Sequence, residues 1–380
     1  MKNLIFKFVF FVLLCTLVIS SFCGKTICYA NSIIPAKSAC VIEGNSGKVL
    51  YEKNKDQKLA MASTTKIATL IVALENYENL DNIVKVSDLA VGVEGTSIYL
   101  DYEEEIRFYD LLVGLMLASG NDCAVAIAEE VCGSEEFVVK MNNMAKVAGA
   151  ENTNFVNVHG LDADGHYTTA YDLAKITAYG LKNEKFKEIC SIKNAIINST
   201  NKRDTRYLKH KNKLLFTEEN CIGVKTGFTD NAGRCLVNAH EENDMQIITV
   251  LLNCGPMFEV AKQLTELSIE KYVMKEFVSP YTFISEIDVE NGDKNKISVV
   301  TVEGYKIPIL KGEIDLYKVE YNLPDKLIAP VEINNVIGNV KVYYNDEEIF
   351  SEDLYAIDES KNINIKYLLE SIINEWYYLN

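Results

Sequence analysis

The stretch Ala62-Ser63-Thr64-Thr65-Lys66 stands at the start of a strong helical pattern. The apolar residues that follow repeat at the spacing of one helix face: Ile67, Leu70, Ile71 and Leu74. Ser63 is therefore expected at or near a helix N-terminus, where unpaired N–H groups favour negative charge. Lys66 falls on the same face, one turn further on. A serine hydroxyl is a poor nucleophile without a neighbouring base, and the amine of Lys66 is a candidate for that base.

The Ser-x-x-Lys spacing alone proves little. It occurs three times in this chain, at Ser63/Lys66, Ser199/Lys202 and Ser268/Lys271. A match of this kind is usually a solvated helix face. The first match therefore needs support from other parts of the chain.

Length and composition favour a globular protein of two domains. The chain has 380 residues, of which 48% are hydrophobic and 24% charged. The net charge of −16 and the pI of about 4.9 argue against a nucleic acid as partner.

The N-terminus has the pattern of a secretory signal. Lys2 and Lys7 accompany an apolar run over 8–19, and Cys28-Tyr29-Ala30 has small residues at the two positions that a signal peptidase reads. Residues 1–30 are therefore predicted to be a signal peptide cleaved after Ala30, which implies export to the cell envelope. An uncleaved N-terminal anchor is the alternative.

Seven cysteines follow the predicted cleavage site: Cys40, Cys123, Cys132, Cys190, Cys221, Cys235 and Cys254. An exported protein usually pairs its cysteines, but seven is an odd number and no CxxC pair is present. Several lie in apolar runs. We expect buried thiols that behave as small apolar residues.

The first elements of the mature chain are a hairpin and apolar helices. Two short strands, 38–43 and 48–52, flank the turn signal Gly44-Asn45-Ser46-Gly47. The helix that begins at Ser63 continues to about Tyr77 and is apolar over most of its circumference, as a buried helix is. A second apolar helix is predicted over 110–118.

Ser119-Gly120-Asn121 separates that helix from a third, predicted over 122–132. Gly120 permits an irregular backbone, so Ser119 and Asn121 can present side chains from a loop held between two helices. The alternative is a plain helix break with Asn121 or Asp122 as N-cap. Ser-x-Asn also recurs at Ser199-Thr200-Asn201.

The segment 155–174 leads into another helix, with Thr168 or Thr169 as cap and Asp172 in the first turn. Its acidic and histidine residues could suggest a metal cluster: His159, Asp162, Asp164 and His166. No HExxH motif or close histidine pair supports zinc, so hydrogen bonding in an ordered loop is the preferred interpretation.

An antiparallel meander is predicted from three strands, 222–228, 234–240 and 245–253. Lys225-Thr226-Gly227 occurs once, at the end of the first strand. At a sheet edge this strand could pair with an extended peptide while Lys225 and Thr226 contact an anion. An ordinary strand end is the alternative.

The C-terminal third is predicted to be a separate β domain. A helix over about 259–277 and a linker at Ser279-Pro280 precede residues 281–360, which alternate with period 2. The last stretch places apolar residues on one helical face: Ile365, Leu368, Leu369, Ile372, Ile373 and Trp376. An amphipathic helix over 361–380 could lie on a membrane surface or dock on the β domain.

Ser63-x-x-Lys66, Ser119-x-Asn121 and Lys225-Thr226-Gly227 occur together and in order, each in a fitting local structure. In this, and in the segment 155–174, the chain resembles the serine-type D-alanyl-D-alanine carboxypeptidases, the low-molecular-mass penicillin-binding proteins of the peptidase S11 type. The resemblance implies an α+β fold, an antiparallel sheet flanked by helices plus an all-helical lobe, followed by a small all-β domain. The implied domains are 31–277 (catalytic), 278–360 (β) and the helix 361–380.

The resemblance also implies roles for the motif residues. Ser63 attacks the carbonyl between two terminal D-alanines, and a neutral Lys66 takes its proton; burial and the nearby Lys225 would depress the pKa of Lys66. Ser119 relays a proton to the leaving amine. Asn121 holds the acyl side of the peptide.

The Lys225-Thr226-Gly227 strand is implied to receive the terminal carboxylate of the substrate. The N–H groups of Ser63 and Phe228 are implied to form the oxyanion hole, typically worth about 3 kcal/mol per donor. Phe228 stands where some members of the family have histidine. Lys211 stands where many have a carboxylate-binding arginine, and a lysine lacks the bidentate fork.

The implied partners are peptidoglycan stem peptides ending in D-Ala-D-Ala, penicillins as covalent inhibitors, and the membrane surface, with no cofactor, no metal and no nucleic acid. Two alternatives remain. A secreted class A β-lactamase shares the three motifs, but it needs a loop Glu-x-x-x-Asn where this chain has His159-Gly160-Leu161-Asp162, and the appended β domain argues against it. A non-catalytic penicillin-binding wall protein is the other, and the intact motifs argue against it.

Overall fold

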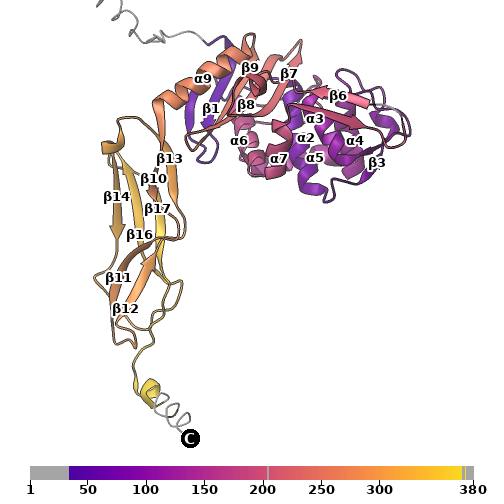
Figure 1. Cartoon of the computed structure of the whole chain (residues 1–380). Helices are drawn as coiled ribbons and strands as arrows, with labels where there is room; N and C mark the ends of the chain where they lie inside the picture. Colours follow the sequence, from indigo (N-terminus) through magenta and orange to yellow (C-terminus); the bar gives the residue numbers. More distant parts are fainter. Residues whose placement is uncertain (1–33, 203–204, 370–372, 374–380) are drawn as a thin grey trace, which may run out of the picture. The chain divides into compact units, whose positions relative to one another are not determined.

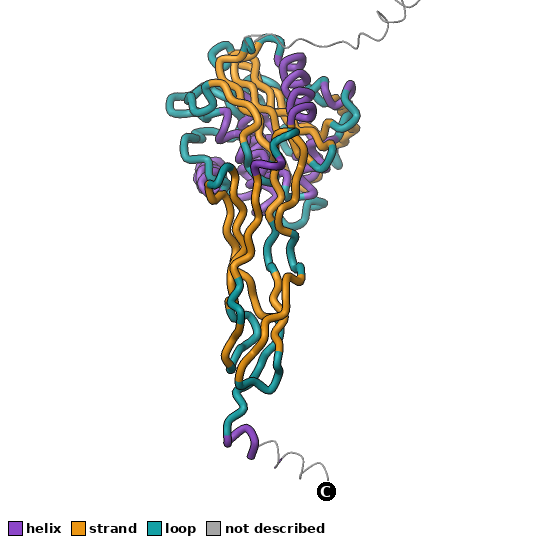
Figure 2. Tube along the Cα trace, turned by 90° about the vertical axis from the view of Figure 1, so that its left-hand side faces the viewer, coloured by secondary structure: helices purple, strands orange, loops and turns teal. Residues whose placement is uncertain are grey.

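The computed structural model describes residues 34–202, 205–369 and 373 (Figure 1). The predicted signal peptide, 1–30, and Trp376 lie outside these residues. The predicted fold class is confirmed: helices and an antiparallel sheet come first, and the rest of the described chain is almost entirely strands (Figure 2).

A five-stranded antiparallel sheet forms the first part, in the order β2-β1-β9-β8-β7. Its strands are β1 (Ala36–Glu43), β2 (Val49–Lys53), β7 (Cys221–Thr229), β8 (Gly233–Glu242) and β9 (Met245–Cys254). The predicted hairpin and meander are confirmed, and β7, which carries Lys225-Thr226-Gly227, is an edge strand. Helix α9 (Met257–Lys271) packs on β8 and β9, while α6 (Ala170–Leu181) packs on β1 and β9 from the other side (Figure 1).

A helical lobe adjoins this sheet. It contains α2 (Lys66–Asn76), α3 (Phe108–Leu117), α4 (Asn121–Val131) and α5 (Ser134–Val147), with α7 (Glu184–Ser191) against β7. Short elements complete it: η1 (Ala62–Thr65), β3 (Ile83–Lys85), η2 (Asp88–Ala90), β4 (Glu105–Arg107), β5 (Asn194–Asn198), β6 (Thr205–Lys209) and α8 (Leu214–Thr217). Helix α2 contacts α3, α4 and α5, and eight of its eleven residues are buried. This burial fixes the end of the helix that carries Ser63 and Lys66.

Helix α6 begins as the sequence indicates. The side chain of Thr169 accepts a hydrogen bond from the backbone N of Asp172 at 3.0 Å, which satisfies one of the unpaired N–H groups of the first turn. The carboxylate of Asp172 in turn accepts from the backbone N of Asn152 at 2.6 Å. The cap therefore also fixes the preceding loop to the helix.

The predicted helix over 259–277 is wrong in its last turns. Helix α9 ends at Lys271, and the chain continues directly into strand β10 (Tyr272–Val278). Strand β10 pairs antiparallel with β13 (Tyr305–Leu310), about thirty residues further along. Since a strand partner so far away in sequence leaves no local signal, this pairing overrides the helical pattern that precedes it.

The β part contains β10 with β13 and a six-stranded sheet in the order β14-β16-β17-β12-β11-β15. Its further strands are β11 (Phe283–Glu290), β12 (Lys296–Val300), β14 (Tyr317–Asn322), β15 (Lys326–Ile328), β16 (Val336–Tyr344) and β17 (Glu347–Ala356), with η3 (Ile314–Leu316) before β14. Alternate residues of β16 point inward, with Val340 and Val342 fully buried. The predicted period-2 alternation is thus confirmed.

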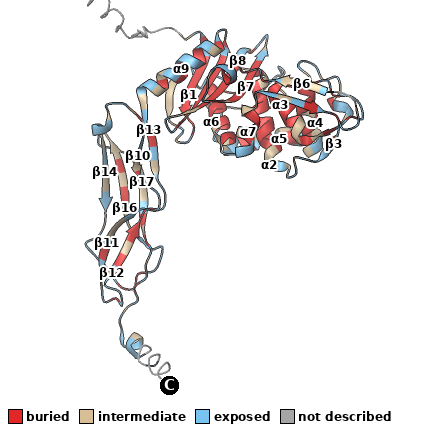
Figure 3. Cartoon of the chain, in the orientation of Figure 1, coloured by how far each residue is buried: buried red, intermediate tan, exposed pale blue. Residues whose placement is uncertain are grey.

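The buried residues form separate cores in the helix-and-sheet part and in the β part (Figure 3). One large apolar cluster joins α2–α6 to the sheet, and smaller clusters fill the β part. The seven cysteines named above are all free thiols; six are buried, as expected, and Cys132 is half-buried. Among the described residues, no helix combines the length and apolarity needed to cross a membrane.

Candidate active site

Ser63 lies in the short helix η1, immediately before α2. The preceding residue, Ala62, has φ +48°, in the left-handed region that a residue with a Cβ atom rarely adopts. Gly227 of β7 approaches so closely that a Cβ there would lie 3.0 Å from the backbone N of Ser63. The sheet edge and the end of the helix therefore meet at Ser63.

Lys66 is the first residue of α2 and is fully buried. Its Nζ donates to the hydroxyl of Ser63 at 3.2 Å, to Oδ1 of Asn121 at 2.6 Å and to the carbonyl oxygen of His159 at 2.7 Å. Burial lowers the pKa of Lys66 to about 7, and the charge of Lys211 acts in the same direction. A neutral amine beside Ser63 is thus accessible near neutral pH.

Lys225 is a second fully buried lysine. Burial holds its pKa well below the usual value, and the charges of Lys66 and Lys211 lower it further. Its Nζ donates to the carbonyl oxygen of Thr226 at 3.0 Å. The charge of Lys211 lowers the pKa of both buried lysines, so a bound anion would offset the mutual repulsion of these amines.

The connection between α3 and α4 differs in detail from the sequence-based expectation. The left-handed residue is Ser119, with φ +67°, whereas Gly120 has φ −60°. Glycine is needed at 120 because a Cβ there would lie 2.7 Å from a carboxylate oxygen of Asp122. Asn121 is the first residue of α4 rather than a loop residue, and its amide is held at both ends: Oδ1 accepts from Lys66, and Nδ2 donates to the carbonyl oxygen of Glu94 at 2.6 Å.

A cleft of about 410 Å³ opens beside Ser63. Of the residues proposed from the sequence, Ser63, Ser119, Lys211, Thr226, Gly227 and Phe228 line it. Lys66 contacts Ser63 and Asn121, and Lys225 is the buried residue of β7 next to Thr226. The cleft also has four lining residues that sequence reasoning missed: Thr96, Arg234, Met257 and Phe258. The structure therefore brings all nine proposed residues into or next to one cavity.

Known proteins resemble this chain over most of its length. The family profile described as "D-alanyl-D-alanine carboxypeptidase" (peptidase S11) matches residues 26–255. The chain belongs to this family. A second profile, the C-terminal domain of penicillin-binding protein 5, matches residues 272–362.

Relatives cover nearly the whole chain. The D-alanyl-D-alanine carboxypeptidase DacF of Bacillus subtilis is 31% identical over 90% of this chain and 90% of its own length. DacA of Haemophilus influenzae is 32% identical over 86% of this chain and 85% of its own. The crystal structure of penicillin-binding protein 5 from Haemophilus influenzae covers 87% of this chain and 99% of its own, with a TM-score of 0.76 and 29% identity.

The loop that reaches Lys66 is fixed by His166. Its Nδ1 accepts from the backbone N of Val156 at 3.1 Å, so Nε2 carries the proton and donates to Oγ1 of Thr65 at 2.8 Å. Thr65 donates to the carbonyl oxygen of Ala62 at 2.9 Å. Burial lowers the pKa of His166 to about 4, so the ring stays neutral and keeps this tautomer. The predicted role of this histidine in an ordered loop is confirmed.

Asp122 is a positioning residue that the sequence analysis considered only as a possible cap. Its carboxylate accepts from the hydroxyl of Ser97 at 2.5 Å and from the backbone N of Ile98 and of Leu100 at 3.0 and 3.1 Å. The segment that supplies Thr96 to the cleft is thereby held against α4. A carboxylate one residue after Ser-x-Asn, at a helix start, is the signal that could have indicated it.

The two other Ser-x-x-Lys pairs have structural roles. Ser268 donates to the carbonyl oxygen of Leu264 within α9 at 2.8 Å. Ser199 accepts from the backbone N of Lys202 at 3.1 Å in the connection between β5 and β6. Neither serine contacts a lysine amine as Ser63 does.

Gly160→Ala is expected to damage the site through the backbone. Gly160 has φ +93°, and a Cβ there would lie 2.0 Å from the carbonyl oxygen of Ala62, so the loop must move. Because the carbonyl oxygen of His159 holds Lys66, we expect penicillin acylation to slow by about 100-fold and stability to fall by about 3 kcal/mol. Acylation kinetics with a fluorescent penicillin and thermal unfolding measure these effects.

Gly165→Ala is the matched control. Gly165 also has a left-handed φ, +82°, but the nearest atom to its Cβ would be 3.7 Å away. It should cost about 1 kcal/mol of backbone strain and leave acylation nearly unchanged. Equal effects of the two substitutions would show that strain, not the contact with Ala62, explains the loss.

Proposed function

We propose that the chain is a serine-type D-alanyl-D-alanine carboxypeptidase that removes the terminal D-alanine of peptidoglycan pentapeptides through an acyl-enzyme on Ser63. The observation that carries the proposal is the 3.2 Å contact between Lys66 Nζ and Ser63 Oγ at the floor of a cation-rich cleft. Membership of the S11 family supports the same reaction.

The first half of the reaction forms the acyl-enzyme. Neutral Lys66 accepts the proton of Ser63 as the hydroxyl oxygen attacks the carbonyl between the two D-alanines. The tetrahedral oxyanion is stabilised by the backbone N–H groups of Ser63 and Phe228, each worth about 3 kcal/mol. Ser119 relays the proton to the leaving amine, which departs as D-alanine. Water then hydrolyses the ester of Ser63.

The terminal carboxylate of the substrate is received by Thr226, Lys225 and Lys211. Its arrival supplies the negative charge that the buried lysines lack, so it should raise the pKa of Lys225 on binding. The proposed role of Asn121 is to hold the acyl side of the peptide. Its hydrogen bond to Lys66 adds a second role, in positioning the base.

Lys211→Arg is expected to lower the KM for an acyl-D-Ala-D-Ala peptide about tenfold, because a guanidinium can bind a carboxylate with two parallel hydrogen bonds. Lys211→Ala should raise KM by a similar factor with a smaller change in kcat. Steady-state release of D-alanine, recorded for each variant at the plateau of its own pH profile, measures this. Unchanged KM in both variants would contradict a carboxylate role for Lys211.

The proposed location is the outer face of the cytoplasmic membrane. The segment 1–30 would direct export, and the C-terminal helix would attach the protein to the lipid surface. In support, the described apolar residues of that helix are exposed: Ile365, Leu368, Leu369 and Ile373. Sedimentation with vesicles should retain the full-length mature protein and release a variant that ends at residue 360; equal sedimentation of both would contradict the attachment.

Penicillin treatment tests the reaction. We expect a persistent mass increase of one penicillin per molecule, located by digestion to the peptide that contains Ser63, together with release of D-alanine from a pentapeptide. Rapid loss of the adduct with penicilloate release would indicate a β-lactamase instead. Absence of both labelling and D-alanine release would indicate a non-catalytic wall protein.

A further inference from the structure

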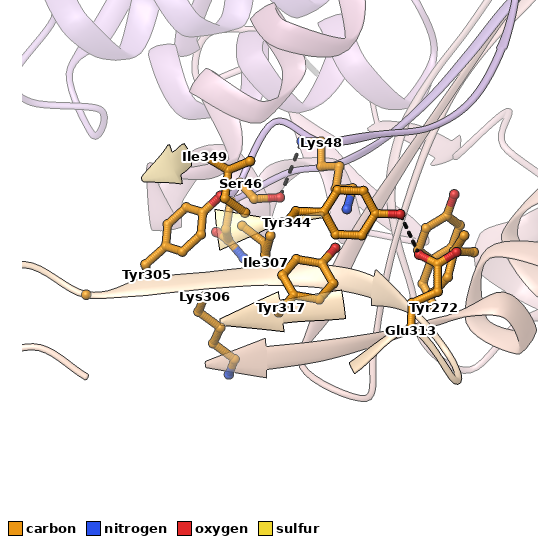
Figure 4. Close-up of a pocket in the computed structure, with 13 residues that line it drawn as sticks. Ser46, Lys48, Tyr272, Tyr305, Lys306, Ile307, Glu313, Tyr317, Tyr344 and Ile349 are labelled. Atoms are coloured by element: carbon orange, nitrogen blue, oxygen red, sulfur yellow. Dashed lines mark hydrogen bonds between the residues drawn. The ribbon is translucent and has the colours of Figure 1, made fainter. Parts of the chain in front are cut away.

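A second cavity, of about 670 Å³, is lined by the β part and by Asn45, Ser46 and Lys48 of the turn between β1 and β2 (Figure 4). It shares no lining residue with the cleft at Ser63. Four tyrosines contribute to its walls: Tyr272 of β10, Tyr305 of β13, Tyr317 of β14 and Tyr344 of β16. Lys48, in the turn before β2, and Glu313 also line it. Concave sites with apolar walls and a few convergent polar groups are the usual places for ligand binding.

Contacts with other aromatic rings hold three of the tyrosine rings in place. Tyr305 stacks on Phe350 with centroids 4.3 Å apart, and Tyr317 stacks on Phe277 at 4.8 Å. Tyr344 contacts Tyr317 at a tilt, also at 4.8 Å. All four lining tyrosines are only half-buried. Rings fixed in this way present an apolar face and a hydroxyl edge at little cost in side-chain entropy.

The charged groups of the cavity are of opposite sign. Glu313, which can only accept hydrogen bonds when ionised, accepts from the hydroxyl of Tyr344 at 3.2 Å (Figure 4). Lys48, which can only donate, uses one hydrogen on the carbonyl oxygen of Pro308 at 2.9 Å. Lys306 lines the cavity too, but its charge is paired with Asp244 at 3.2 Å.

This arrangement selects the chemistry of the ligand. Because Lys48 and Glu313 both line the cavity, a ligand with a single charge is attracted by one of them and repelled by the other, so the two effects oppose each other. A neutral ligand with hydroxyl or amide groups can accept from Lys48 and donate to Glu313 while its apolar face covers a tyrosine ring. A pyranose sugar has this combination of an apolar C–H face and a polar edge.

We propose that the cavity binds a neutral N-acetylated sugar ring of a glycan strand. The biological consequence rests on the proposed function, since the stem peptides cleaved at Ser63 are attached to such strands. Binding of the glycan strand at this second site raises the effective concentration of its stem peptides at the catalytic cleft. Free peptides gain nothing from this site.

The test uses the full-length mature protein and N-acetylchitotetraose, a neutral four-sugar probe, in a calorimetric titration. We expect saturable binding that weakens at least tenfold in Tyr317→Ala and several-fold in Tyr344→Phe, which removes only the hydroxyl that contacts Glu313. Tyr321→Ala is the control, because Tyr321 lies on the same strand, β14, but does not line the cavity. It should bind as the unaltered protein does.

Several outcomes would overturn the proposal. These are no saturable binding by the unaltered protein, binding undiminished in both cavity variants, or preferential binding of a sugar-free stem peptide. D-alanine release from a free pentapeptide should be equal in all variants, whereas release from glycan-linked substrate should fall several-fold in Tyr317→Ala. Sugar binding without any D-alanine release from the unaltered protein would refute the proposed function and leave the sugar site standing.

Discussion

Ser63→Ala is expected to abolish penicillin labelling and to reduce D-alanine release by at least about 10⁴-fold. The substitution removes the hydroxyl that accepts from the amine of Lys66 at 3.2 Å and lines the cleft. Losing the nucleophile eliminates the covalent route entirely. Mass spectrometry of the penicillin-treated protein and a D-alanine assay on a pentapeptide measure the two effects. Residual release should come from binding and oxyanion stabilisation alone.

The fold should survive this substitution. The hydroxyl of Ser63 accepts one hydrogen bond, from Lys66, which keeps two other acceptors in Asn121 and the backbone of His159. Thermal unfolding should therefore change little. Ser268→Ala is the matched control, since it alters the serine of another Ser-x-x-Lys pair and should retain full labelling. An adduct that still forms in Ser63→Ala would contradict the nucleophile assignment.

Much of this site could be predicted because its chemistry is carried by side chains in short local motifs. Ser63 and Lys66 share one helical turn, and Lys225-Thr226-Gly227 ends a strand with a clear alternating pattern. The cap of α6 at Thr169 was visible for the same reason, since a capping residue and its partner lie three positions apart. Local spacing is what a sequence shows directly.

The parts that were missed depend on backbone groups or distant partners. The carbonyl oxygen of His159 holds Lys66, yet a carbonyl oxygen carries no residue signature. Ala62 and Ser119 have a left-handed backbone conformation. It could not be predicted from the sequence, because neither residue is a glycine. Strand β10 follows α9 without a break because its partner, β13, lies far along the chain. In each case the decisive contact is made by the tertiary structure.

Lys66→Met is the second prediction with a large expected effect. Methionine keeps much of the buried volume but cannot accept a proton, so acylation by penicillin should slow by at least about 10³-fold. Stopped-flow or quenched mixing with a fluorescent penicillin measures the rate, and thermal unfolding checks the fold. Acylation within tenfold of the unaltered rate would exclude Lys66 as the base.

The pH dependence of the unaltered protein gives an independent test of the same role. A base must be unprotonated to act, and the pKa of Lys66 is lowered to about 7, chiefly by burial and further by the charge of Lys211. The acylation rate should therefore rise about tenfold per pH unit below pH 7 and level off near pH 8. Lys211→Ala removes one of the charges that lower this pKa, so the rising limb should move to higher pH. A rate that is flat from pH 5.5 to 8, or a limb that does not move in Lys211→Ala, would mean that another group takes the proton of Ser63.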